Sequence, residues 1–373
     1  MKSDERFTLT SFLLTILRLW GRRIPRILWR TRRLALGVLR SRVRRRRLLR
    51  REGLLAPIGV GLSPTMRCNL RCEGCYARLY PRENEMGMEV LERTVSSARE
   101  CGVVLFVVTG GEPYLRADLL DLYRRHRGAL FLTITNGTML DKDTVGRIAA
   151  LGNVFPIVSV EGDREQTDRR RGRGVYDQAM RAMDLLREAG VLFGFSATLT
   201  RDNIATLCGV SFLRRMIGKG CAFGFYNELI PVCPHDEELV PGEEQRRLLR
   251  ERLRVHRRTE PAVLVHLPDD EYDASGRCGA VTEGGMHINA QGFVEPCPFA
   301  HYARENVATS SFREVLASPF LAAIRAHPTA LIRGSSGCAL SCNLEVLREI
   351  AGQTGARPTT RPEQAARPPR AVS

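Results

Sequence analysis

The stretch Cys68-Asn-Leu-Arg-Cys72-Glu-Gly-Cys75-Tyr76 places three cysteines within eight residues, in the spacing C-x3-C-x2-C. It follows an apolar run, 57–62, that predicts a buried strand. Three thiolates on one short loop can hold three irons of a [4Fe–4S] cube and leave the fourth iron without a protein ligand. A metal needs such an open coordination position if it is to react with a substrate.

A structural zinc site is the alternative for these cysteines. Zinc in such sites takes four ligands, usually from paired C-x2-C or Cys/His sets. The sequence has no fourth cysteine or histidine close to this loop. The spacing therefore favours iron–sulfur over zinc, and the motifs after the later strands decide between the two.

The spacing, followed by an aromatic residue, resembles the signature loop of the radical S-adenosylmethionine (SAM) enzymes. In that family the open iron binds the amino and carboxylate groups of SAM. An electron from the cluster then splits SAM into methionine and a 5′-deoxyadenosyl radical, which takes a hydrogen atom from the substrate. The resemblance implies that Cys68, Cys72 and Cys75 hold this cluster and that Tyr76 contacts SAM. It also implies a reducing partner such as ferredoxin or flavodoxin.

Composition limits the possible classes of protein. A chain of 373 residues can form one large or two moderate domains, each with a core. Its 11 cysteines gather in motifs, which predicts a reducing compartment and metal chemistry rather than a disulfide scaffold. The net charge of +16 belongs mainly to residues 1–52, which contribute +14, so the remaining chain is nearly neutral.

Residues 1–52 form a basic arm for which the pattern predicts an amphipathic helix. Apolar residues between 12 and 28 recur at three- and four-residue steps, with arginines on the other face. Pro25 is expected to kink or split this helix. Both tryptophans, Trp20 and Trp29, lie in the arm. These features are typical of a helix lying on an anionic membrane, so we expect a cytoplasmic protein at the inner face of the cell membrane.

Other interpretations of the arm stay open. A spanning helix needs about 20 largely apolar residues, and arginine interrupts the run too early. No small-residue cleavage site follows, so a secretory signal fits poorly. The helix could instead be solvated, docked on the protein's own body, or bound to RNA. A nucleic-acid partner is the less favoured of these because the body has no matching excess of basic residues.

Strand-like and helical segments alternate over residues 53–235. This alternation predicts an α/β fold in which parallel strands with right-handed crossovers form a partial (β/α)6 barrel of the TIM type. Helices are expected at 88–100 and 176–189. The six expected strands are 58–62, 103–109, 129–135, 154–160, 192–199 and 222–228. Chemistry in such folds lies at the carboxyl ends of the strands, so functional motifs should follow each strand.

Gly110-Gly111-Glu112-Pro113 follows the second expected strand. Two adjacent glycines let the backbone approach a ligand closely, although the tetrapeptide alone could be only a turn. It resembles the GGE motif of the radical SAM enzymes, which contacts the amino group of SAM. The resemblance therefore implies cofactor-binding roles for Gly110, Gly111 and Glu112.

The ends of the later strands supply further candidates. By the same resemblance, Ser159 and Glu161 would approach the carboxylate and ribose of SAM; otherwise they would only cap a helix. Arg201 could bind a carboxylate such as that of SAM, or lie on the surface. Glu228 and Cys233 would lie near the barrel mouth as candidate catalytic residues. Cys233 could donate a hydrogen atom or bind substrate, or be a small buried apolar residue.

Three cysteines and two turns receive smaller roles. Residues 170–174, Arg-Arg-Gly-Arg-Gly, resemble the R-G-x-G stretch of relatives that carry an accessory cluster domain, and their alternative is a flexible basic loop. Thr135-Asn136-Gly137 resembles the TNG turn of the family, and Asn-Gly is also simply a good turn. Cys101, Cys208 and Cys221 lie in or beside apolar segments and are expected in the core.

A second set of cysteines follows a polar connector, 236–277, in which a charged helix is expected near 243–257. A hairpin is predicted over 286–295, and helices are expected at 312–317 and 319–326. The set consists of Cys278, Cys297, Cys338 and Cys342. Zinc would suit four thiolates, whereas disulfides conflict with an open iron–sulfur cube in the same chain.

The arrangement of this second set resembles the SPASM or twitch domain of radical SAM enzymes. The resemblance implies an auxiliary [4Fe–4S] cluster on the four cysteines, in a domain over 278–350. The last pair departs from the family because three residues, rather than two, separate its cysteines. Residues 351–373, rich in Pro, Arg and Ala at their end, are expected to be a disordered tail.

The resemblance covers about 55–345 and implies an enzyme that cleaves SAM reductively to abstract a hydrogen atom. The arm adds the expectation of a lipid or other membrane-associated substrate. Relatives with such an accessory domain also modify peptides or proteins, so a maturase is an alternative. A non-catalytic iron–sulfur electron carrier at the membrane surface is the alternative from another class, and it predicts no SAM binding.

Overall fold

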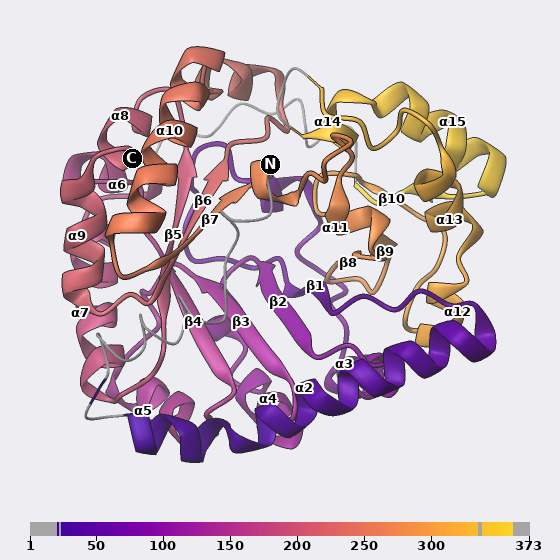
Figure 1. Ribbon diagram of the computed structural model, residues 1–373, viewed down its shortest axis with the longest axis horizontal. Helices are drawn as coiled ribbons and strands as arrows, with labels where there is room; N and C mark the ends of the chain where they lie inside the picture. The colour runs from indigo at the N-terminus through magenta and orange to yellow at the C-terminus, as the bar shows by residue number, and fades with distance from the viewer. Residues whose placement is uncertain (1–20, 22–23, 335–337, 361–373) are drawn as a thin grey trace. The chain divides into compact units, whose positions relative to one another are not determined.

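The computed structural model describes residue 21 and residues 24–334 and 338–360, with side chains described from Trp29 onward (Figure 1). The chain divides into two compact units. The first unit comprises the part up to Thr31 together with Leu70–Gly74 and Ile134–Asp270. The second comprises Arg32–Asn69, Cys75–Thr133 and the part from Glu271 onward. The domain boundaries expected at 52, 235 and 277 stay predictions.

The strands of the first unit are parallel, in the order β7-β6-β5-β4. They are β4 (Val154–Ser159), β5 (Gly194–Leu199), β6 (Phe223–Glu228) and β7 (Val263–Leu267). The apolar side chains of β4 and β5 are buried, as in parallel sheets covered by helices. The first three coincide with expected strands. β7 was missed, because the segment 236–277 was interpreted as a connector without strands.

The second unit holds β1 (Gly59–Thr65), β2 (Leu105–Gly110) and β3 (Leu130–Thr135), which are parallel to one another. The predicted hairpin is present as β8 (His287–Ile288) and β9 (Val294–Glu295). The hairpin is not separate from these strands, because β8 pairs in parallel with β1 and the order is β3-β2-β1-β8-β9. The segment that precedes Cys297 is therefore fixed to the strand that leads into the first cysteine loop.

Helices connect the strands. In the first unit, α7 packs against β4 and α8 against β5 (Figure 1). The helices of the first unit from residue 134 onward are α5 (Lys142–Leu151), α6 (Arg164–Arg171), α7 (Val175–Glu188), α8 (Ile204–Leu207), α9 (Val210–Lys219) and α10 (Glu243–Thr259). Those of the second unit are α3 (Met88–Glu100), α4 (Leu119–Arg125), α11 (Gly279–Thr282), α12 (Phe312–Leu316), α13 (Pro319–Ala326), α14 (Ala339–Cys342) and α15 (Leu344–Thr354).

The expected disordered tail is wrong for residues 351–360. Helix α15 continues to Thr354, because Leu347 and Ile350 are buried and the helix packs against α13. The chain then forms β11 (Arg357–Pro358), which pairs antiparallel with β10 (Tyr302–Ala303). Residues 361–373 lie outside the described part of the chain.

The basic arm contains helix α2 (Ile24–Glu52). From Gly37 onward, this helix packs against other segments of the second unit. Gly37 lies against Gly128, where an added Cβ would fall 1.8 Å from the carbonyl oxygen. The Ser41 hydroxyl donates to the Gly102 carbonyl. The face of the helix that carries Gly37 and Ser41 is therefore docked on the protein's own body, which was one of the alternatives for the arm.

Two further expectations concern the start of the arm. Pro25 is expected to kink or split the helix; the two residues just before α2 lie outside the described part of the chain, so this stays a prediction. Pro25 is the second residue of α2, where a missing backbone N–H removes no intrahelical hydrogen bond. The apolar pattern expected between 12 and 28 lies mostly outside the described residues, and Trp20 does so entirely.

Candidate functional site

The cysteine loop carries three half-buried thiols, Cys68, Cys72 and Cys75. Partly exposed thiols on a loop are suited to binding a metal cluster, in contrast to the buried Cys101, Cys208 and Cys221 of the core. In the second unit, Cys75 directly precedes a short 3₁₀ helix, Tyr76–Leu79.

Two arginines of the first unit hold the middle of this loop. Arg171 Nη1 lies 4.0 Å from Cys72 Sγ. The backbone N–H of Glu73 donates to the carbonyl of Arg170 at 3.1 Å. Residues 170–174 were interpreted as a loop, but Arg170 and Arg171 form the last turn of α6. A guanidinium group beside a cysteine sulfur stabilises the negative charge that the thiolate carries.

The Gly-Gly-Glu motif runs alongside the residues that enter the cysteine loop. Gly111 N–H donates to the Thr65 carbonyl and Glu112 N–H to the Arg67 carbonyl, each at 2.9 Å. A Cβ on Gly111 would lie 2.0 Å from the Arg67 carbonyl oxygen. Gly110 has φ = +100°, in the region that favours glycine. The close approach that these glycines permit therefore involves the chain's own backbone, whereas the sequence suggested only an approach to a ligand.

Gly111→Ala is expected to displace the motif and to lower by about 100-fold the SAM cleavage that the resemblance implies, the cost of roughly 1 Å of misplacement at a reacting site. The added methyl group meets backbone atoms of Arg67 and Met66, which cannot rotate away. Gly352→Ala is the matched control, because an added Cβ there has no heavy atom within 4 Å in helix α15. Release of 5′-deoxyadenosine measures the effect, and equal rates for the two variants would contradict the prediction.

Tyr76 connects the cysteine loop to the glycine motif. Its hydroxyl accepts a hydrogen bond from Gly110 N–H at 3.0 Å and pairs with Thr109 Oγ1 at 3.0 Å. Burial raises the pKa of Tyr76 to about 12, so the phenol stays neutral at physiological pH. Of the predicted cofactor residues, the second unit thus brings Tyr76 and Gly110 into direct contact.

Glu112 and Arg116 lie beside the backbone that leads into the cysteine loop. Arg116 was not identified from the sequence. The Glu112 side chain is buried, and its Oε1 accepts from Tyr114 N–H at 3.1 Å. Arg116 donates to the carbonyls of Pro64 and Met86, each at 2.9 Å. Arg116 therefore fixes the backbone just ahead of the cysteine loop.

Glu161 lies at the centre of a buried ionic cluster in the first unit. Its Oε1 accepts from Arg170 Nη1 and Arg171 Nε, each at 2.7 Å, and its Oε2 from Thr198 N–H at 2.8 Å. Burial alone would raise the pKa of Glu161, but the Arg171 and Arg170 guanidinium groups outweigh it and hold the pKa below its usual value. Asn203 adds a bond from its side-chain amide to the Glu161 carbonyl at 3.2 Å.

The other candidates of the first unit have different surroundings. Ser159 is buried at the end of β4. Asp163, rather than Ser159 or Glu161, caps helix α6. Arg201 is exposed, and its guanidinium donates to the Val240 carbonyl at 3.4 Å. Arg201 thus has the position of a surface arginine, the alternative left open for it.

Glu228 belongs to a second buried cluster, at the end of β6. It accepts from Arg246 Nε at 2.8 Å and is hydrogen-bonded to His266 Nε2 at 3.1 Å. Asp269 lies close to His266. The side chains of Glu228, His266 and Asp269 each place a potential metal-ligand atom within 4.8 Å of the other two. The Arg246 cation already balances the Glu228 carboxylate. Cys233 is buried, in keeping with a small apolar residue.

The second cysteine set gathers in the second unit. The pKa of the Cys278 thiol is raised to about 12, mainly by burial, with smaller contributions from the charges of Glu271 and Cys338. Burial also raises the pKa of Cys297, again with contributions from Cys338 and Cys278. These three thiols are therefore close enough to interact electrostatically. Cys342 ends helix α14, which follows Cys338, so it stands one helical turn from that thiol.

A buried hydrogen-bond network, not identified from the sequence, joins the two cysteine-bearing regions of the second unit. Ser63 on β1 bonds to His287 Nε2 at 2.7 Å, and His287 Nδ1 bonds to Glu295 at 2.7 Å. Tyr80 donates to the same carboxylate at 2.8 Å. In addition, the rings of Tyr76 and Phe299 lie 5.5 Å apart, so residues just beyond Cys75 and Cys297 touch.

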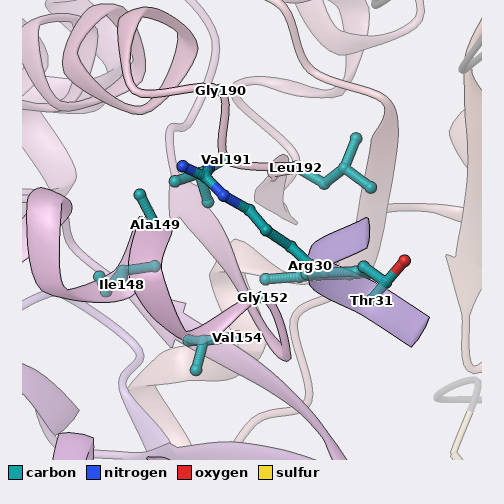
Figure 2. A pocket seen from close by; sticks show the side chains of 10 residues that line it. Arg30, Thr31, Ile148, Ala149, Gly152, Val154, Gly190, Val191 and Leu192 are labelled. Carbon is teal, nitrogen blue, oxygen red and sulfur yellow. The ribbon is translucent and has the colours of Figure 1, made fainter. Parts of the chain in front are cut away.

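A pocket of the first unit lies at the amino ends of β4 and β5, away from the motifs at the carboxyl ends. Figure 2 shows Arg30 of α2 extending across it toward Gly190 and Val191. The Arg30 guanidinium donates to the Ala189 carbonyl at 3.4 Å. The pocket is therefore occupied by the protein's own arginine and carries none of the predicted site residues.

The sequence matches the Radical SAM superfamily over residues 62–209. An AdoMet-dependent heme synthase from Nitratidesulfovibrio vulgaris is 26% identical over 279 residues, which cover 67% of this chain and 76% of that protein. The mycofactocin maturase MftC of Mycolicibacterium smegmatis is 30% identical over 163 residues, 42% of this chain and 41% of that protein. Matches to several other heme-related synthases span 36% to 38% of those proteins.

Among solved structures, Streptococcus suis SuiB bound to S-adenosylmethionine has a TM-score of 0.64 at 18% identity, covering 76% of this chain and 71% of that chain. This likeness confirms the predicted α/β class with parallel strands and helices. Among the described helices, none combines the length and the apolar character needed to cross a membrane.

Proposed function

Because the chain belongs to the radical SAM superfamily, we propose that Cys68, Cys72 and Cys75 hold the cluster that this enzyme uses to cleave SAM. The enzyme's cofactors are a [4Fe–4S] cluster and SAM. When bound, the cluster supplies the electron that splits SAM into methionine and a 5′-deoxyadenosyl radical. The observation that carries the proposal is the pairing of Gly111 and Glu112 with the backbone that enters the cysteine loop.

The residues around the loop suit these cofactors. The three thiols are partly exposed, as cluster ligands must be before assembly. The glycine motif and Tyr76 would line the SAM site, with Glu112 as an acceptor for the amino group.

We assign the second cysteine set to an auxiliary [4Fe–4S] cluster. Cys278, Cys297 and Cys338 are half-buried, and desolvation raises their pKa values. A cationic metal centre would offset the cost of ionising these desolvated thiols. Cys342 completes a set of four ligands.

For the substrate, the alignment to the heme synthase favours a tetrapyrrole, since it spans 76% of that protein and extends beyond the superfamily region. A porphyrin combines an apolar ring with carboxylates, which fits an enzyme working at a membrane surface. A peptide or protein maturase is the second candidate, supported by the shorter match to MftC. A lipid substrate stays a further proposal that rests on the arm alone.

We also place the enzyme in the cytoplasm, at the inner face of the membrane, with ferredoxin or flavodoxin as the reducing partner. The basic arm supports this location through its charge. It is a proposal separate from the chemistry, and each can be tested without the other.

The protein, reconstituted with iron and sulfide under anaerobic conditions and reduced, is expected to release 5′-deoxyadenosine from SAM. Iron coproporphyrin III, the compound named in one relative, is the first substrate to add, and a mass change of that porphyrin would support the tetrapyrrole proposal. Cleavage of SAM without a change in the porphyrin would contradict the tetrapyrrole proposal but would still support the proposal that the enzyme cleaves SAM. No cleavage, together with a fully ligated cluster, would favour the electron carrier.

A further inference from the structure

We propose that the outward face of α2 binds the surface of an anionic phospholipid bilayer while the opposite face stays docked on the second unit. The inference deepens the membrane location proposed above by naming the surface that makes the contact. We define the outward face as Trp29, Leu36, Leu39 and Val43 with the arginines beside them.

The outward face is an apolar stripe exposed to solvent. Trp29 is 65% exposed, Leu36 52%, Leu39 60% and Val43 58%. At about 100° per residue these four positions fall within an arc of about 80° on the helix. An exposed group of apolar side chains of this kind indicates a surface that another apolar phase covers.

The docked face lies on the other side of the same helix. Leu48 is buried there, and Arg45 Nε donates to the Ala56 carbonyl at 2.7 Å. Arg44 Nη1 donates to the Arg99 carbonyl at 2.8 Å. Because these contacts do not use the apolar stripe, the helix can bind a second surface without leaving the first.

Charge identifies the partner as anionic. Helix α2 contains 12 arginines and one acidic residue. Exposed arginines adjoin these apolar residues. Arg40 lies beside the arc, and Arg32, Arg47 and Arg50 fall within it, between or beyond the apolar positions. Each basic residue near an anionic membrane surface adds to the attraction within a Debye length.

The apolar stripe distinguishes a bilayer from a nucleic acid. Leucine and valine gain nothing from a phosphate backbone, whereas they insert into the boundary between headgroups and acyl chains. A tryptophan at the end of the stripe is the residue type most enriched at that boundary.

The test compares two double variants of the full-length protein in sedimentation with vesicles. Leu36→Ser with Val43→Ser removes two exposed residues of the stripe seven positions apart. Leu248→Ser with Val255→Ser is the matched control, because these residues of α10 are also exposed, of the same two types and seven positions apart. The vesicles are equal parts phosphatidylcholine and phosphatidylglycerol, or phosphatidylcholine alone.

Wild type and control are expected to bind the anionic vesicles equally, more weakly in high salt, and to bind phosphatidylcholine little. The stripe variant should bind at least about tenfold more weakly, since two half-immersed aliphatic side chains are lost. Equal binding by the stripe variant and the control would overturn the proposal. So would tight binding of an RNA duplex without vesicle binding. SAM cleavage, assayed separately in solution, reports on the reaction independently.

Discussion

Cys72→Ser is expected to abolish release of 5′-deoxyadenosine and to remove one [4Fe–4S] cluster's worth of iron from the reconstituted protein. A serine hydroxyl is a much poorer iron ligand than a thiolate, and only three cysteines are available on this loop. Cys72 is also the cysteine beside Arg171, whose Nη1 lies 4.0 Å from its sulfur. Iron analysis and electron paramagnetic resonance of the reduced protein measure the loss.

Two other cysteine variants make the result specific. Cys208→Ala changes a buried core cysteine and should keep full iron content and SAM cleavage. Cys338→Ala should remove the auxiliary cluster alone and keep the SAM-cleaving signal. If Cys72→Ser retained both its iron and its activity, the assignment of the first cluster would be wrong. If Cys338→Ala lost no iron, the assignment of the auxiliary cluster would be wrong, and the assignment of the first cluster would be unaffected.

The strands were predictable because buried parallel strands have continuous apolar sequences. β4 and β5, for example, contain the runs Val-Phe-Pro-Ile-Val and Gly-Phe-Ser-Ala-Thr-Leu, and both strands lie within the ranges expected. β7 was missed because it is only five residues long, includes His266 and lies between charged segments. A short strand of this kind is defined by its pairing with β6, which the sequence does not reveal.

The motif residues of the site were predictable, but their partners were not. Gly110, Gly111 and the cysteines stand out by type and spacing. Arg170 and Arg171 look like solvated charges in a basic run, and only the tertiary fold brings them to Glu161. The one available signal was the position of this run, directly after the strand and turn that carry Glu161.

The sequence contained an indication that one face of the arm docks on the body, but the many charged residues obscured it. Gly37 and Ser41 are small residues four positions apart, a spacing that lets another backbone approach a helix closely. The many arginines favoured a membrane-facing interpretation for the whole helix. The structure divides the helix into a docked face and an outward face, and charge alone could not separate the two.

Glu161→Gln is expected to lower the free energy of unfolding by about 3–5 kcal/mol, the cost of breaking a buried ion pair by removing one partner. The amide is nearly the same size, so packing is kept, but two guanidinium groups at 10% and 11% exposure lose their counterion. Asp177→Asn is the control, because its ion pair with Arg164 is exposed and should add nothing measurable. Denaturant titration at neutral pH compares the three proteins.

The same carboxylate predicts the effect of acid. Because the pKa of Glu161 is held below its usual value in the folded protein, its contribution is complete above the pKa of the unfolded chain. The contribution is lost as the pH falls through the folded-state pKa, so wild type should lose more stability on acidification than Glu161→Gln does. Adding Arg171→Gln to Glu161→Gln removes one of the unpaired charges and should restore part of the lost stability. Additive losses in the double variant, or parallel acid profiles, would show that the cluster does not act as a coupled unit.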